Sequence, residues 1–141
     1  MELTIQEAKE IAEILGSGII IYIHTETREI TELMDFNHPY ADASQKELWA
    51  DAFDYVNENR DNLIELRQLP SRDAFYIMEQ FVLQLPQGWM KNILIGALQG
   101  RKPFARFKEK LRSNDAVLEQ WYAFKLEQDA IWVQNYCRRE G

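Results

Sequence analysis

The densest group of functional side chains in this sequence is a basic segment, GRKPFARFKEKLRSN, at residues 100–114. It holds six cations and one anion, whereas the whole chain has a formal net charge of −7. Guanidinium and ammonium groups at this density bind carboxylates or phosphates through charge-assisted hydrogen bonds. We therefore predict a binding surface, which we call the basic strip, made of Arg101, Lys102, Arg106, Lys108, Lys110 and Arg112.

The same segment also has the pattern of an ordinary amphipathic helix. Phe104, Phe107 and Leu111 recur at spacings of three and four, which predicts one buried face of a helix over residues 103–113. Pro103 suits the first turn of such a helix. The cations then face water and cover the edge of the core with their aliphatic stems. A binding surface and a merely solvated face are both consistent with the sequence.

The other chemistry-bearing residues form no catalytic or metal-binding pattern. His24 and His38 are not spaced to share a metal with each other or with the single cysteine, Cys137, so we predict no metal and no cofactor. Neighbouring arginines favour a lowered pKa for the Cys137 thiol, but no base is placed to activate it, and we expect a partly buried structural thiol. No phosphate-binding loop, nucleophile elbow or kinase motif occurs. The sequence therefore leans away from an enzyme and names no catalytic residue.

Composition predicts one folded domain over residues 1–141. The hydrophobic fraction of 46% supplies a core, and no apolar stretch approaches the length of a membrane span. The single cysteine excludes an internal disulfide, and the N-terminal segment has acids where a signal peptide carries bases. We therefore expect a soluble cytoplasmic protein with no membrane partner.

Charge is divided unevenly along the chain. Residues 1–70 hold fifteen acids against five bases, and residues 71–141 hold eight against eleven. A globally acidic protein repels polyanions at long range, which disfavours general nucleic-acid binding. This division predicts a protein partner, or self-association, through an acidic surface that meets the basic strip.

Hydrophobic periodicity and capping signals predict an α+β fold that is mostly helical: a small antiparallel sheet packed against about six helices. Ile19–Ile23 is β-branched and aromatic, and with residues 29–33 it predicts a hairpin, although Arg28 stands where a turn favours Gly or Asn. Residues 63–69 predict a third strand at the hairpin edge, with continuation of the preceding helix as the alternative for residues 61–66. Predicted helices cover residues 4–15, 44–59, 71–85, 89–98 and 103–113 and a long segment from 115, and residues 35–44 are a predicted loop.

Several segments of the chain resemble a bacterial group, uncharacterised protein family 0158. They are ALQGRKPFARFKEKL (97–111), WYAF (121–124), PSRDAFYIMEQF (70–81) and, more weakly, IYIHTETREI (21–30). In the last segment His24 replaces an acidic residue of the family pattern and Arg28 replaces its glycine. The resemblance implies a stand-alone cytosolic bacterial protein and brings no established activity.

Three hypotheses for function follow. The first is a non-enzymatic protein-interaction or regulatory module that uses the basic strip. The second is a nucleic-acid accessory factor that combines the strip with nearby aromatic residues, of which Phe124 and Trp132 are expected to be free for stacking whereas Trp121 and Tyr122 pack inward. The third is an enzyme whose site forms in a cleft between the hairpin and the helices.

Overall fold

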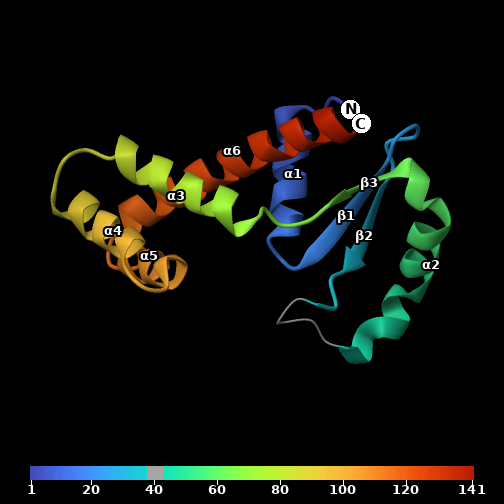
Figure 1. Ribbon diagram of the computed structural model, residues 1–141, viewed down its shortest axis with the longest axis horizontal. Helices are drawn as coiled ribbons and strands as arrows, with labels where there is room; N and C mark the ends of the chain where they lie inside the picture. Colours follow the sequence, from blue (N-terminus) through green and yellow to red (C-terminus); the bar gives the residue numbers. More distant parts are fainter. Residues whose placement is uncertain (38–42) are drawn as a thin grey trace. The chain divides into compact units, whose positions relative to one another are not determined.

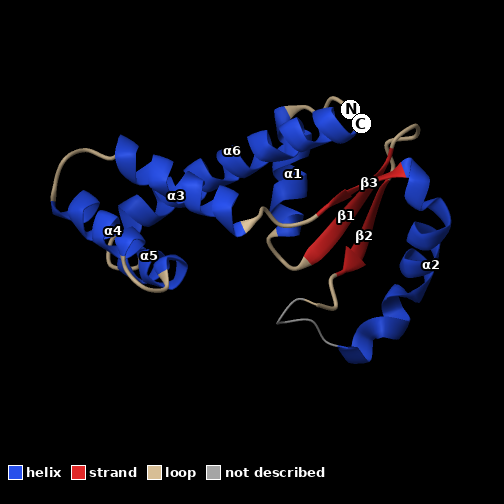
Figure 2. Ribbon diagram, viewed as in Figure 1, coloured by secondary structure: helices blue, strands red, loops and turns tan. Residues whose placement is uncertain are grey.

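The computed structural model describes residues 1–37 and 43–141 (Figure 1). The described residues form six α-helices, two short 3₁₀ helices and a three-stranded antiparallel sheet (Figure 2). The predicted α+β class, with a small sheet and about six helices, is confirmed. The predicted loop at residues 35–44 falls largely on residues 38–42, which lie outside the described residues.

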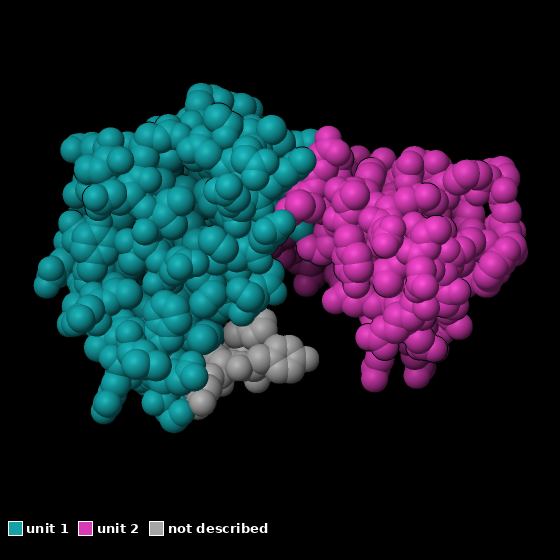
Figure 3. Space-filling model, turned by 180° about the vertical axis from the view of Figure 1, so that it is seen from behind, with its two compact units in different colours: residues 1–68, 129–141 teal, residues 69–128 magenta. Residues whose placement is uncertain are grey.

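The chain divides into two compact units (Figure 3). Unit 1 comprises residues 1–68 and 129–141, and unit 2 comprises residues 69–128. The long helix α6 (Asp115–Glu140) contributes its first part to unit 2 and its last turns to unit 1. The prediction of one domain over residues 1–141 stays a prediction.

The sheet of unit 1 has the order β2-β1-β3, with β1 (Ile19–His24) between β2 (Ile30–Met34) and β3 (Leu63–Leu66). Both faces of a central strand are covered, which explains the unbroken apolar run of β1. The predicted hairpin and third strand are confirmed. The helical alternative for residues 61–66 is wrong, because the 3₁₀ turn η2 (Arg60–Asn62) ends where β3 begins.

Each face of the sheet packs against helices. On one face α1 (Ile5–Leu15) contacts β1, and its predicted capping box is confirmed by reciprocal hydrogen bonds between Thr4 and Glu7. On the other face α2 (Ala50–Asn59) places Val56 against Ile20 and Tyr22. The last turns of α6 bury Ala130, Val133 and Cys137 in the same unit.

The segment before α2 differs from the prediction. We predicted one helix from Ser44 to Asn59, but residues Ala43–Trp49 form a 3₁₀ helix, η1, and α2 begins at Ala50. Because a 3₁₀ helix has about three residues per turn, Leu48 leaves the apolar stripe. Its exposed fraction is 79%, and Phe53 is also half-exposed.

The hairpin turn explains both departures from the family pattern. The ring nitrogen Nδ1 of His24 accepts hydrogen bonds from the backbone N–H groups of Glu26 (3.1 Å) and Thr27 (3.2 Å), as a short carboxylate would. Arg28 adopts the left-handed conformation, with φ of 64°, that favours glycine. The Arg28 guanidinium lies 3.4 Å from the Glu7 carboxylate, so the side chain ties the turn to α1.

Unit 2 is a helical cluster around three aromatic rings. It contains α3 (Ser71–Gln84), α4 (Trp89–Gln99), α5 (Pro103–Leu111) and the start of α6. The rings of Phe81, Phe107 and Trp121 meet edge to face, with centroids 4.9 to 6.4 Å apart. Such contacts stabilise a core beyond the burial of area alone.

Candidate functional site

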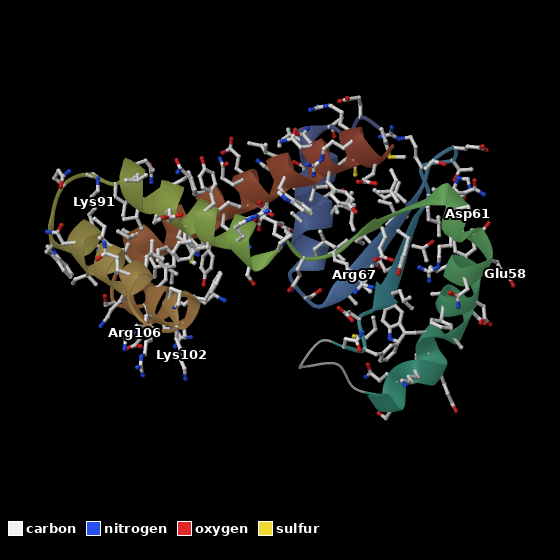
Figure 4. The ribbon with its side chains drawn as sticks, in the orientation of Figure 1. Glu58, Asp61, Arg67, Lys91, Lys102 and Arg106 are labelled. Atoms are coloured by element: carbon white, nitrogen blue, oxygen red, sulfur yellow. The ribbon has the colours of Figure 1, made fainter. Side chains whose placement is uncertain are left out.

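The basic strip lies on and just before α5, the helix that the sequence predicted. Phe107 and Leu111 are fully buried, whereas Phe104 is 36% exposed and meets the ring of Phe75 edge to face at 6.3 Å. The predicted inward stripe is therefore confirmed for two residues and lies at the core edge for the third. All six residues of the strip are exposed, and Figure 4 shows Lys102 and Arg106 pointing away from α5.

The strip residues are free of ion pairs with other described residues. Another cation of this unit does form hydrogen bonds: the half-buried Lys91 of α4 donates to the carbonyl oxygens of Leu83 (3.1 Å) and Leu85 (3.2 Å) at the end of α3. Lys91 therefore has a structural role, because it caps the C-terminal end of a helix. The ammonium and guanidinium groups of the strip form no such hydrogen bond with a described residue.

The entry to α5 is held in an unusual backbone conformation. Lys102 has φ of 50°, in the left-handed region, directly before Pro103. The guanidinium Nη1 of Arg106 packs over the backbone of Gly100, 3.1 Å from where a Cβ would lie. Both features place strip residues at the first turn of α5, and neither could be predicted from the sequence pattern.

The aromatic part of the nucleic-acid hypothesis is not supported as predicted. Phe124 and Trp132 are half-buried, and the Trp132 ring stacks on Tyr136 at 5.2 Å. Trp121 is buried, as predicted, but Tyr122 is 61% exposed, so its predicted inward position is wrong. Residues 121 and 122 are neighbours on a helix and point about 100° apart, so burial of Trp121 turns Tyr122 outward.

A pocket of about 490 Å³ lies in unit 1, on the sheet face that α2 covers. Ile20, Tyr22 and Leu33 line it from the sheet, and Trp49 and Phe53 line it from η1 and α2. Its size and its apolar, aromatic lining are typical of small-molecule sites. The third hypothesis predicted a cleft between hairpin and helices, and this pocket occupies that place without naming a reaction.

Charged residues at one side of the pocket bind one another. Nε of Arg67 lies 2.7 Å from the Glu65 carboxylate, and its Nη1 lies 3.4 Å from that of Asp35. Burial alone would raise the pKa of Glu65, but hydrogen bonds from Arg67 and Tyr22 outweigh it and lower that pKa. Burial, aided by the Glu65 charge, raises the pKa of Tyr22 to about 12.

The lining holds three carboxylates. Those of Asp35 and Glu65 are paired with Arg67, whereas the exposed Asp54 forms no ion pair with another described residue. Sequence reasoning predicted a cleft at this place but not its lining residues, because they come from three strands, a 3₁₀ helix and an α-helix. The one available signal was alternation, which places Glu65 and Arg67 on the same face of β3 and its extension.

Cys137 is more buried than the sequence predicted. The Cys137 thiol is fully buried, and burial raises its pKa, so the sequence signal for a lowered pKa is wrong: desolvation outweighs the nearby positive charges.

No three His, Cys, Asp or Glu side chains of residues 1–37 and 43–141 gather as metal ligands, and His38 lies outside the described residues. No helix in the described part of the chain is both long and apolar enough to cross a membrane.

Comparison with known proteins identifies the family. The family model described as "Uncharacterised protein family (UPF0158)" matches residues 15–141, and the chain belongs to this family. A UPF0158 protein of Pseudomonas aeruginosa is 28% identical over 84 residues, which cover 59% of this chain and 55% of the relative. The chain thus spans about half the length of the curated relative it matches. No solved structure matches.

Proposed function

We propose that this protein is a non-enzymatic interaction module whose basic strip docks on an acidic surface of a protein partner. The observation that carries the proposal is the strip itself: six exposed cations, without an ion pair to any other described residue, on and at the two ends of a helix anchored by buried Phe107 and Leu111. A rigid helix that presents unpaired charges loses little side-chain and backbone freedom on binding. Charge complementarity then gives such a surface its association rate and its choice of partner.

A protein partner is favoured over a nucleic acid. The chain carries a net charge of −7, which opposes the approach of a polyanion. The two rings that the sequence offered for stacking, Phe124 and Trp132, are also less accessible than predicted, because both are half-buried. Exposed Tyr122 is the one ring of the WYAF segment that offers a free face.

A charge-reversal pair tests the proposal. The strip variant carries Lys102→Glu and Arg106→Glu, and a matched control carries Lys9→Glu and Arg72→Glu, which change the net charge equally outside the strip, at half-buried Lys9 and exposed Arg72. We expect the tagged wild-type chain and the control to capture the same protein partner after nuclease treatment, and the strip variant to lose it. Equal capture by all three proteins would show that the strip is only solvated, and loss of capture on nuclease treatment would favour nucleic acid.

The pocket of unit 1 supports a second candidate function, the binding of a small ligand with an apolar ring or chain. Its volume of about 490 Å³ and the rings of Trp49 and Phe53 are the observations that favour it. Native mass spectrometry of the purified protein would detect such a ligand as added mass. We expect Ala50→Trp, which fills the pocket from its rim, to remove that mass, and Ala116→Trp on exposed α6 surface to leave it.

A further inference from the structure

The outer face of α2 carries a row of acids, which we call the acidic ridge. Asp51, Asp54 and Glu58 recur at spacings of three and four and so share one helix face, away from buried Val56. The ridge extends into the flanking 3₁₀ turns through Glu47 and Asp61. All five side chains are exposed, and Figure 4 shows Glu58 pointing away from the sheet.

The ridge is unpartnered within the described part of the chain. The ion pairs of unit 1 involve other acids: Arg60 approaches Glu65 and Arg28 approaches Glu7. None of the five ridge carboxylates is within ion-pair distance of a described cation. Five like charges on one side of a helix repel one another, and a cationic surface that docks there relieves this repulsion.

The two units carry opposite charge, and the ridge and the strip fit each other in length. Unit 1 holds seventeen acids against seven bases, a balance of −10, and unit 2 holds six against nine, a balance of +3. At 1.5 Å rise per residue, Asp51 to Glu58 spans about 10 Å and Lys102 to Lys110 about 12 Å. Two helices laid side by side therefore match several cations to several carboxylates.

We infer that the partner of the basic strip is a second copy of this chain, docked through its acidic ridge. The inference rests on the proposed function and names its partner. One large apolar side chain next to ridge residue Glu47, Leu48 with an exposed fraction of 79%, adds area that such a contact buries. The ion pairs supply specificity and the apolar contacts supply the hydrophobic part of the free energy.

The contact joins two different surfaces. If a two-fold axis forms it twice, the interface is isologous and the assembly is a closed dimer; if each pair of copies forms it once, the interface is heterologous and builds a ring or a filament. Either way the mass must rise with protein concentration, which separates association between copies from any attraction within one chain. The contact must also weaken with salt, because its charges are exposed and the screening length shrinks from about 10 Å at 0.1 M to about 3 Å at 1 M.

Complementation between two reversed proteins tests the inference. The strip variant (Lys102→Glu with Arg106→Glu) keeps a native ridge, and a ridge variant (Asp51→Lys with Glu58→Lys), which changes no residue of the pocket lining, keeps a native strip. By sedimentation velocity at about 0.05 M salt, we expect the wild-type mass to rise from 16.7 kDa toward at least twice that value. Each variant alone should associate at least about 30-fold more weakly. An equimolar mixture of the two should regain association as a one-to-one complex.

Matched controls exclude a general effect of net charge. The variant Glu10→Lys with Glu13→Lys makes the ridge variant's charge change on the exposed face of α1, and it should associate like wild type. A wild-type chain that stays monomeric at every concentration overturns the inference, and so does a mixture that fails to complement. The proposed function stands separately in these cases if the strip variant still loses the captured partner, and it falls with the inference if no protein binds in a strip-dependent manner.

Discussion

Replacing Phe107 with Ala tests the packing that holds the basic strip in place. The ring is fully buried and meets Phe81 and Trp121 edge to face, with centroids 6.4 and 4.9 Å away. Burial of a Phe side chain contributes about 1.5 to 3 kcal/mol, and each aromatic contact adds about 0.5 to 1.5 kcal/mol. We therefore expect Phe107→Ala to lower the free energy of unfolding by about 3 to 5 kcal/mol, the range seen for such truncations.

Phe104 provides a matched control on the same helix. It is 36% exposed and has one ring contact, with Phe75, so Phe104→Ala should lower the free energy of unfolding by only about 1 kcal/mol. Urea titration followed by circular dichroism at the helical band measures both changes. Equal losses for the two variants, or a loss below about 1.5 kcal/mol for Phe107→Ala, would refute the placement of α5 against the core.

Three further predictions concern unit 1. His24→Asp should keep the turn, because a carboxylate can accept the same two backbone hydrogen bonds. His24→Leu should lower the free energy of unfolding by about 1 to 2 kcal/mol, which thermal denaturation measures as a lower melting temperature. Equal melting temperatures for the two variants would contradict this role of His24. Arg28→Gly should relieve about 1 kcal/mol of left-handed backbone strain. Because the Arg28–Glu7 ion pair that it removes is exposed and therefore weak, the denaturation midpoint should rise. A lower midpoint would show that the ion pair contributes more to stability than the strain costs. Because the pKa of Tyr22 is raised to about 12, the unfolded chain releases the phenol proton at lower pH than the folded chain does. The free energy of unfolding should therefore fall by roughly 2 kcal/mol between pH 10 and 12. Denaturation measured as a function of pH should show this fall in the wild type and not in Tyr22→Phe.

Local signals in the sequence were sufficient for most elements. The capping box of Thr4 and Glu7 marked the start of α1, and the β-branched run of β1 marked the central strand. The basic strip was found the same way, since its cations and the buried rings of α5 are close in sequence. Such patterns work because helix caps, alternation and amphipathic spacing act over a few residues.

The residues that line the pocket could not be predicted because their meeting depends on pairing between distant strands. Tyr22 lies directly opposite Glu65 in the register of β1 and β3, and Arg67 follows on the same side. A shift of that register by one residue would turn these side chains to the opposite face. The 3₁₀ helix before α2 was missed for a related reason, because capping residues such as Ser44 suit either helix type.

The division of the chain into units has a consequence for its synthesis. Unit 2 is one continuous stretch, so all of its packing partners have left the ribosome once residue 128 emerges. Unit 1 still lacks Val133 and Cys137 of its core at that moment, together with Gln134, whose side chain binds the carbonyl oxygen of Leu3. Residues 1–68 must therefore wait for the last turns of α6, while residues 69–128 can fold ahead of them.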